Sequence, residues 1–77
     1  MEATIEVQMV LVNQYGEFRG EIMLVNEEQC VKMIELSKEF YNSGFELHCE
    51  DGSFMVFPPE IVKYSVLKID RKLIEKL

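Results

Sequence analysis

The sequence predicts a single α+β domain over residues 1–77, with strands and one helix in the order ββαβββ. Apolar and polar side chains alternate over residues 4–12 and again over 17–25, which indicates two strands that each bury one face. Apolar residues then recur at helical spacing over 30–41, and two more alternating segments flank an Asp-Gly turn at 51–52. We therefore expect an antiparallel sheet with one amphipathic helix packed on one face, and a short helical or frayed C-terminal tail.

The first two strands are expected to form a hairpin around the turn-forming residues 13–16. A four-residue loop sets a register in which apolar side chains meet across the two strands. The predicted pairs are Val12–Glu17, Leu11–Phe18 and Val7–Ile22. In this register Gly20 lies opposite Met9 on the inner face, where its missing side chain leaves room for a helix to approach.

A capping motif marks the start of the helix. Asn26 can accept hydrogen bonds from the free N–H groups, Gln29 occupies the capping-box position, and the two glutamates between them favour the positive end of the helix dipole. The apolar stripe of the helix comprises Cys30, Met33, Ile34, Ser37, Phe40 and Tyr41. Gly44 is placed to end the helix.

The second hairpin is predicted from Asp51 and Gly52, a dipeptide typical of two-residue turns in which both residues have positive φ. The predicted pairs are Cys49–Phe54 and Leu47–Val56 on the inner side, and His48–Met55 and Glu46–Phe57 on the outer side. Pro58 and Pro59 end the second strand, because proline has no N–H to donate to the ladder.

The last segment fits two alternatives. Apolar residues at helical spacing allow one helix over residues 60–77, whereas the alternation over 65–70 allows a strand. We favour a short turn at 59–63, a strand at about 65–70 and a helical or frayed tail.

Composition narrows the class of protein. Apolar residues make up 48% of the chain, which is ordinary for a globular protein and argues against disorder. The net charge of −6 is uneven, because residues 1–60 carry twelve acidic and three basic side chains and residues 61–77 carry two acidic and five basic ones. This acidity argues against a conventional nucleic-acid binder.

The sequence contains no apolar run of membrane-spanning length and no secretory signal pattern, so we expect no membrane association and a cytoplasmic location.

No group of residues suggests catalysis. His48 and Cys49 are adjacent in a predicted strand and would therefore point to opposite faces, so they cannot form the hydrogen bond that activates a thiol. Cys30 and Cys49 are expected to be buried and inert, and zinc would lack a fourth ligand. The sequence thus predicts a non-enzymatic protein with no catalytic, cofactor-binding or metal-binding residue and no cofactor.

One surface favours protein binding. A single helix covers only one face of the predicted sheet, so the apolar side chains of the other face must meet the C-terminal tail, another subunit or a target. The predicted protein-binding residues are Val10, Val12, Met23, Val25, Met55 and Phe57. We expect a homo-oligomer, with a dimer as the first hypothesis. The alternative is that Leu73, Ile74 and Leu77 fold back and cover this face.

Charge allows two further partners. Rows of carboxylates could imitate the phosphates of a nucleic acid and bind a host protein with a basic surface. In the alternative function, a regulatory nucleic-acid-associated module, a basic cluster would contact phosphates. This cluster comprises Lys68, Arg71, Lys72 and Lys76.

The segment FMVFPPEIVKYSVLKID, residues 54–70, resembles the ending of small uncharacterised proteins from phages and prophages of Gram-positive bacteria. In that family a strand runs into a proline-containing turn with an inward Ile or Val, and then into a final strand. The resemblance implies this local topology and a phage genomic context, but no activity. A phage-encoded modulator or inhibitor of a host protein is the hypothesis that this context suggests. The segment carries no catalytic motif.

Overall fold

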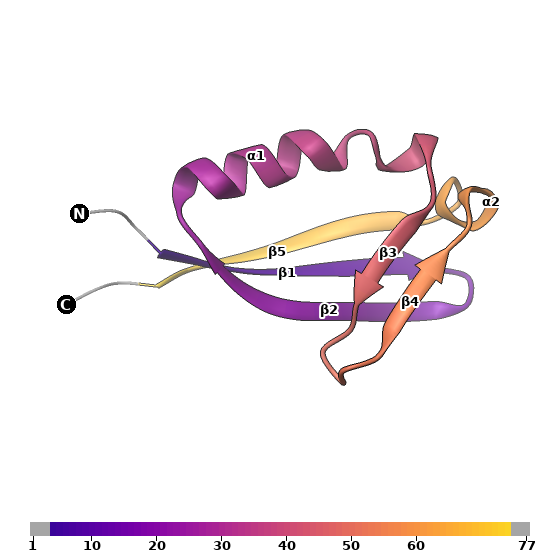
Figure 1. Ribbon diagram of the computed structural model, residues 1–77, viewed down its shortest axis with the longest axis horizontal. Helices are drawn as coiled ribbons and strands as arrows, with labels where there is room; N and C mark the ends of the chain where they lie inside the picture. Colours follow the sequence, from indigo (N-terminus) through magenta and orange to yellow (C-terminus); the bar gives the residue numbers. More distant parts are fainter. Residues whose placement is uncertain (1–3, 75–77) are drawn as a thin grey trace.

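The computed structural model describes residues 4–74, and it confirms the predicted α+β class. The elements are β1 (Thr4–Asn13), β2 (Gly16–Val25), α1 (Glu27–Ser37), a short 3-10 helix η1 (Phe40–Asn42), β3 (Phe45–His48), β4 (Phe54–Phe57), α2 (Pro59–Val62) and β5 (Val66–Ile74). The strands form two antiparallel sheets rather than one: a three-stranded sheet in the order β2-β1-β5, and the hairpin β3-β4. Figure 1 shows both sheets.

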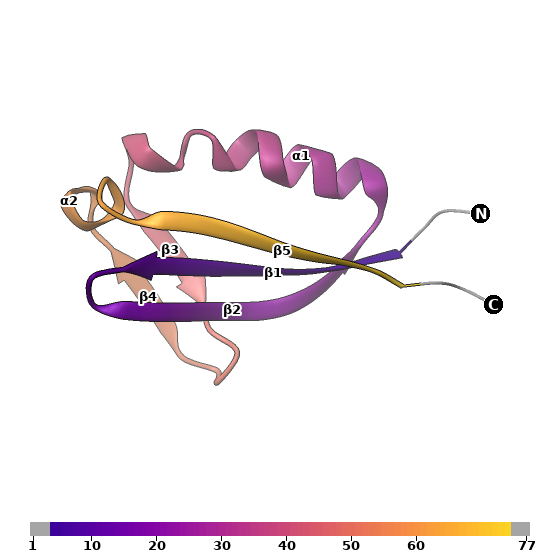
Figure 2. The same ribbon diagram turned by 180° about the vertical axis from the view of Figure 1, so that it is seen from behind.

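The hairpin β3-β4 lies against one side of the three-stranded sheet. It passes in front of β1 and β2 in Figure 1 and behind them in Figure 2. The backbone N–H of Glu50 donates to the carbonyl of Arg19 in β2 (3.1 Å), and Gly20 forms a β-bridge with Cys49. α1 packs on the same side, because residues of α1, Phe45 of β3 and the sheet residues Met9 and Leu67 line one groove.

A bulge interrupts the pairing of β1 with β2. The predicted pairs Val12–Glu17 and Leu11–Phe18 are confirmed. Between Val10 and Gln8 the register shifts by one position, because Gly20 and Glu21 of β2 together oppose Met9 of β1. Gly20 thus lies opposite Met9 as predicted, but the ladder is interrupted there, which was not predicted.

The bulge changes the face on which the rest of β2 lies. Val7 pairs with Met23, not with Ile22 as predicted. Since side chains alternate along a strand, a shift of one residue moves every later side chain to the opposite face. Met23 and Val25 therefore lie on the α1 side of the sheet, whereas Ile22 and Leu24 point away from it.

The loop of the second hairpin is also one residue longer than predicted. The backbone N–H of Cys49 donates to the carbonyl of Ser53 (2.8 Å), which leaves three loop residues, 50–52. Gly52 has a φ of 92°, whereas Asp51 does not have a positive φ, so the predicted two-residue turn is wrong. A three-residue loop with a left-handed glycine is the next most common hairpin connection.

This loop reverses the two sides of β4. Phe57 pairs with Phe45 and Met55 with Leu47, so both residues of β4 face the core rather than the outer side. The Phe57 ring packs against Phe18 of β2 at a centroid distance of 5.3 Å. Phe54 and Val56 take the outer positions and are at least half exposed.

The main core lies between the three-stranded sheet and the elements packed on it. Its buried members are Leu11, Phe40, Leu47, Cys49, Phe57 and Val62. The buried hydroxyl of Ser65 donates to the carbonyl of Ile61 (2.7 Å) and accepts from the side-chain amide of Asn13 (3.2 Å). These bonds satisfy the one buried polar side chain of the described residues and join α2 to the end of β1.

α1 begins as predicted and ends early. The side chain of Asn26 accepts from the N–H of Gln29 (2.7 Å), and the Gln29 side chain accepts from the N–H of Asn26 (2.9 Å). The helix stops at Ser37 and does not continue to Gly44. Gly44 is needed for another reason: a Cβ there would lie 2.9 Å from the carbonyl oxygen of Phe57.

The C-terminal segment follows the favoured alternative. Pro59–Val62 forms the expected short turn, as α2. β5 is longer than predicted and pairs with β1 from Val66 to Ile74. The predicted helical or frayed tail after about residue 70 is therefore wrong as far as Ile74, because Leu73 and Ile74 extend the sheet sideways and do not fold back across it. Residues 75–77, including Leu77, lie outside the described residues.

Gly20→Val should destabilise the fold. A Cβ at Gly20 would lie 2.8 Å from Leu47 Cδ1 and 3.2 Å from the carbonyl oxygen of Met9, so the hairpin must move away from the sheet. We expect the free energy of unfolding to fall by about 1–3 kcal/mol in chemical denaturation. The matched control is Glu21→Val at the exposed neighbouring position, with an expected change within about 0.5 kcal/mol. Equal effects of the two variants would contradict the close approach.

Asp51 should titrate below its ordinary range. The hydroxyl and the N–H of Ser53 donate to its carboxylate (2.6 and 2.9 Å), which lowers the pKa of Asp51 from the usual 3.8. Since the folded pKa is depressed, this stabilisation is present above the usual pKa and is lost as the pH falls through the folded value. In an NMR titration, Ser53→Ala should bring the pKa closer to 3.8, whereas Ser43→Ala should not. An unchanged pKa in Ser53→Ala would contradict this loop geometry.

Candidate functional site

The side of the three-stranded sheet opposite α1 is not crossed by any element between residues 4 and 74 (Figure 2). Four apolar side chains on this side are exposed: Val12 (37%), Ile22 (54%), Leu24 (65%) and Val66 (60%). We call the surface formed by these four residues and the charged residues between them the open face. Exposed apolar patches on a sheet are typical of interaction sites.

The four apolar residues lie in two groups. Val12 of β1 pairs directly with Val66 of β5 at one end of the open face. Ile22 and Leu24 lie on β2 beyond the bulge, toward the other end. The open face therefore has apolar groups at both ends.

A band of ion pairs crosses the middle of the open face. The guanidinium group of Arg19 lies 3.1 Å from the carboxylate of Glu17 and 3.9 Å from that of Asp70. The ammonium group of Lys68 lies 3.4 Å from the Asp70 carboxylate. The band links β2 with β5 across β1 and contains two acidic and two basic side chains. It is locally neutral although the chain is acidic.

Val10 shows how this band acts on the sheet. It lies in the centre of the open face, yet its exposed fraction is 0%. Its neighbours across the ladder are Arg19 and Lys68. Their long aliphatic stems can cover an apolar side chain while the charged ends remain in water. The middle of the open face is thus charged outside and apolar beneath.

The six residues predicted to bind protein do not form one surface. Val10 and Val12 lie on the open face, but Met23 and Val25 lie on the α1 side because of the bulge. Met55 and Phe57 face the core because of the three-residue loop. These four placements correct the prediction, and Ile22, Leu24 and Val66 were missed. Gly20 was the sequence signal for the bulge, since glycine within a strand often marks one.

The basic cluster of the alternative function is divided between two faces. Lys68 and Lys72 lie on the open face, whereas Arg71 pairs with Val7 and lies on the α1 side. Asp70 lies between the two lysines and pairs with Lys68. Lys76 lies outside the described residues.

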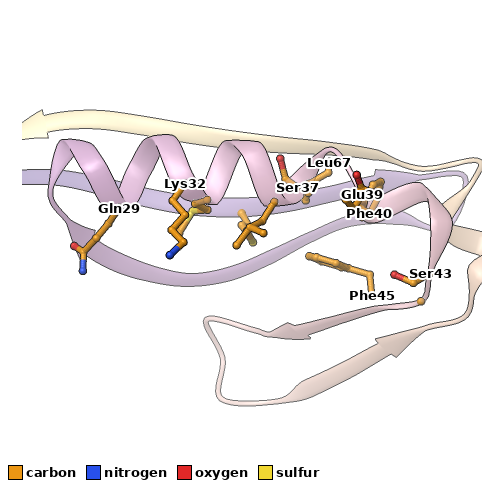
Figure 3. A pocket seen from close by; sticks show the side chains of 12 residues that line it. Gln29, Lys32, Ser37, Glu39, Phe40, Ser43, Phe45 and Leu67 are labelled. Atoms are coloured by element: carbon orange, nitrogen blue, oxygen red, sulfur yellow. The ribbon is translucent and has the colours of Figure 1, made fainter.

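An apolar groove lies between α1 and β3, on the opposite side of the sheet from the open face (Figure 3). Its volume is about 500 Å³. Its apolar lining comes from the sheet, α1, η1 and β3, and consists of Met9, Met33, Leu36, Phe40, Phe45 and Leu67. Lys32 and Gln29 of α1 line one part of the groove, and Glu39 and Ser43 line another.

The potentially reactive side chains are dispersed. Cys30 and Cys49 are buried free thiols. His48 is exposed, and its ring packs on Phe54 at a centroid distance of 4.7 Å. Within residues 4–74, no three His, Cys, Asp or Glu side chains come close enough together to hold a metal ion.

No helix within the described residues has the length and apolar character needed to cross a membrane. Comparisons with protein-family models, curated proteins and solved structures give no match.

Proposed function

We propose that the protein is a small, non-enzymatic protein-interaction module that associates with a second copy of itself through the open face. The observation that carries this proposal is the exposure of Val12, Ile22, Leu24 and Val66 on a sheet face that no described element covers. Exposed apolar side chains raise the free energy of the folded protein in water, and a second copy would lower it by covering them.

The arrangement of the open face supports self-recognition. In a two-fold symmetric dimer, the same patch contributes to the interface from both copies. Apolar groups at both ends allow Ile22 and Leu24 of one copy to meet apolar side chains of the other. The neutral ion-pair band allows Arg19 and Asp70 to meet opposite charges, so the net charge of −6 does not prevent close contact.

The expected affinity is moderate. Burying the exposed part of each of the four side chains contributes on the order of 1–2 kcal/mol, and two copies contribute eight such side chains. Association costs about 4–15 kcal/mol in lost translational and rotational freedom. With the association cost at the low end of this range, about 4 kcal/mol, a gain of about 12 kcal/mol leaves about 8 kcal/mol, which corresponds to a dissociation constant roughly in the micromolar range.

The double variant Ile22→Glu, Leu24→Glu should abolish self-association. Sedimentation equilibrium over a concentration series should show a dimer for the unchanged protein and a monomer for the variant, because two carboxylates per copy would lose hydration in the interface. The matched control is Val31→Glu on α1, which is equally exposed at 60% but lies outside the open face and should leave the dimer intact.

Circular dichroism should be unchanged in both variants, because the substituted side chains are exposed. An unchanged protein that stays monomeric at all concentrations would contradict the proposal. A dimer that survives the double variant would place the interface elsewhere.

A further inference from the structure

The proposed self-association does not involve the apolar groove between α1 and β3. It lies on the α1 side of the sheet, so a dimer formed through the open face leaves it accessible. Its volume of about 500 Å³ falls within the range of about 300–1,000 Å³ that is usual for small-molecule sites.

The interior of the groove is suited to an apolar chain. Met9 and Leu67 of the sheet form part of its lining. The rings of Phe40 and Phe45, which also line it, pack edge to face with their centroids 5.2 Å apart. The hydroxyl of Ser37, which also lines the groove, already donates to the carbonyl of Ile34 (2.6 Å). Leu36 is 66% exposed and would lose much of this exposure against a ligand.

The charges of the lining select the end group of that chain. Among the described lining residues Lys32 carries the positive charge and Glu39 the negative one. The Glu39 carboxylate accepts a hydrogen bond from the side-chain amide of Asn42 (3.2 Å). No carboxylate of the described residues lies within ion-pairing distance of Lys32, whereas Lys38 of the same helical segment pairs with Glu35 at 3.3 Å.

We propose that this groove binds a single unbranched acyl chain that ends in a carboxylate, with the chain against Met9, Leu67 and Phe45 and the carboxylate paired with Lys32. Figure 3 shows the ammonium group of Lys32 and the ring of Phe45 on the same side of α1. The ring lies farther along the groove than the ammonium group. Methionine side chains such as Met9 adapt to flexible apolar ligands, because they are unbranched and polarisable.

Titration calorimetry with three ten-carbon probes tests the proposal. Decanoate should bind in a one-to-one ratio per chain, with a dissociation constant roughly between 0.1 and 1 mM for a ligand of this size. Decanol, which lacks the charge, should bind roughly threefold to fivefold more weakly, and decyltrimethylammonium more weakly still, because Lys32 would repel it.

Two charge-reversal variants locate the carboxylate. Lys32→Glu should weaken decanoate binding roughly tenfold. Lys38→Glu changes the net charge equally and lies on the same helical segment outside the groove, so it should change the affinity less than twofold. Both side chains are exposed, so both variants should fold like the unchanged protein by circular dichroism.

Three outcomes would overturn the proposal. They are the absence of decanoate binding up to its solubility limit, equal affinity for all three probes, and equal loss of binding in Lys32→Glu and Lys38→Glu. Displacement of decanoate when the protein concentration is raised would show that a second copy fills the groove instead. Because Ile22 and Leu24 lie on the other face, their double variant should still bind decanoate, so the two proposals fail separately.

Discussion

The two-residue period of side chains along a strand is the constraint on which this structure depends. Adding one residue to one strand of a pair exchanges the buried and exposed sets beyond that point. The chain does this twice, at the Gly20-Glu21 bulge and in the three-residue loop that contains Gly52. Together these two irregularities decide which apolar side chains enter the core and which remain in contact with water.

The bulge also determines how the layers are assembled. Gly20 has no side chain, so Leu47 and the carbonyl of His48 can approach β2 closely. The hairpin and α1 occupy the same side of the three-stranded sheet, with the groove between them. The opposite side carries the ion-pair band around Arg19, with the buried Val10 between its strands and exposed apolar residues at its two ends.

Local signals in the sequence were sufficient for the α+β class, the capped start of α1 at Asn26, and the turn at Pro59–Val62. Each depends on a few neighbouring residues. The faces of Met23 and Phe57 were predicted wrongly, because each depends on an insertion of one residue whose local signals, Gly20 and Asp51-Gly52, also fit the regular alternative. The groove was not predicted, since its lining residues come from distant parts of the chain.

The most direct test of this account is a set of nuclear Overhauser contacts that report the two registers. We predict contacts between the side chains of Val7 and Met23, and between the Phe57 ring and the rings of Phe18 and Phe45. Contacts of Val7 with Ile22, and of Phe57 with Glu46, would show uninterrupted ladders. They would place Met23 and Phe57 on the opposite faces and contradict both the open face and the core described above.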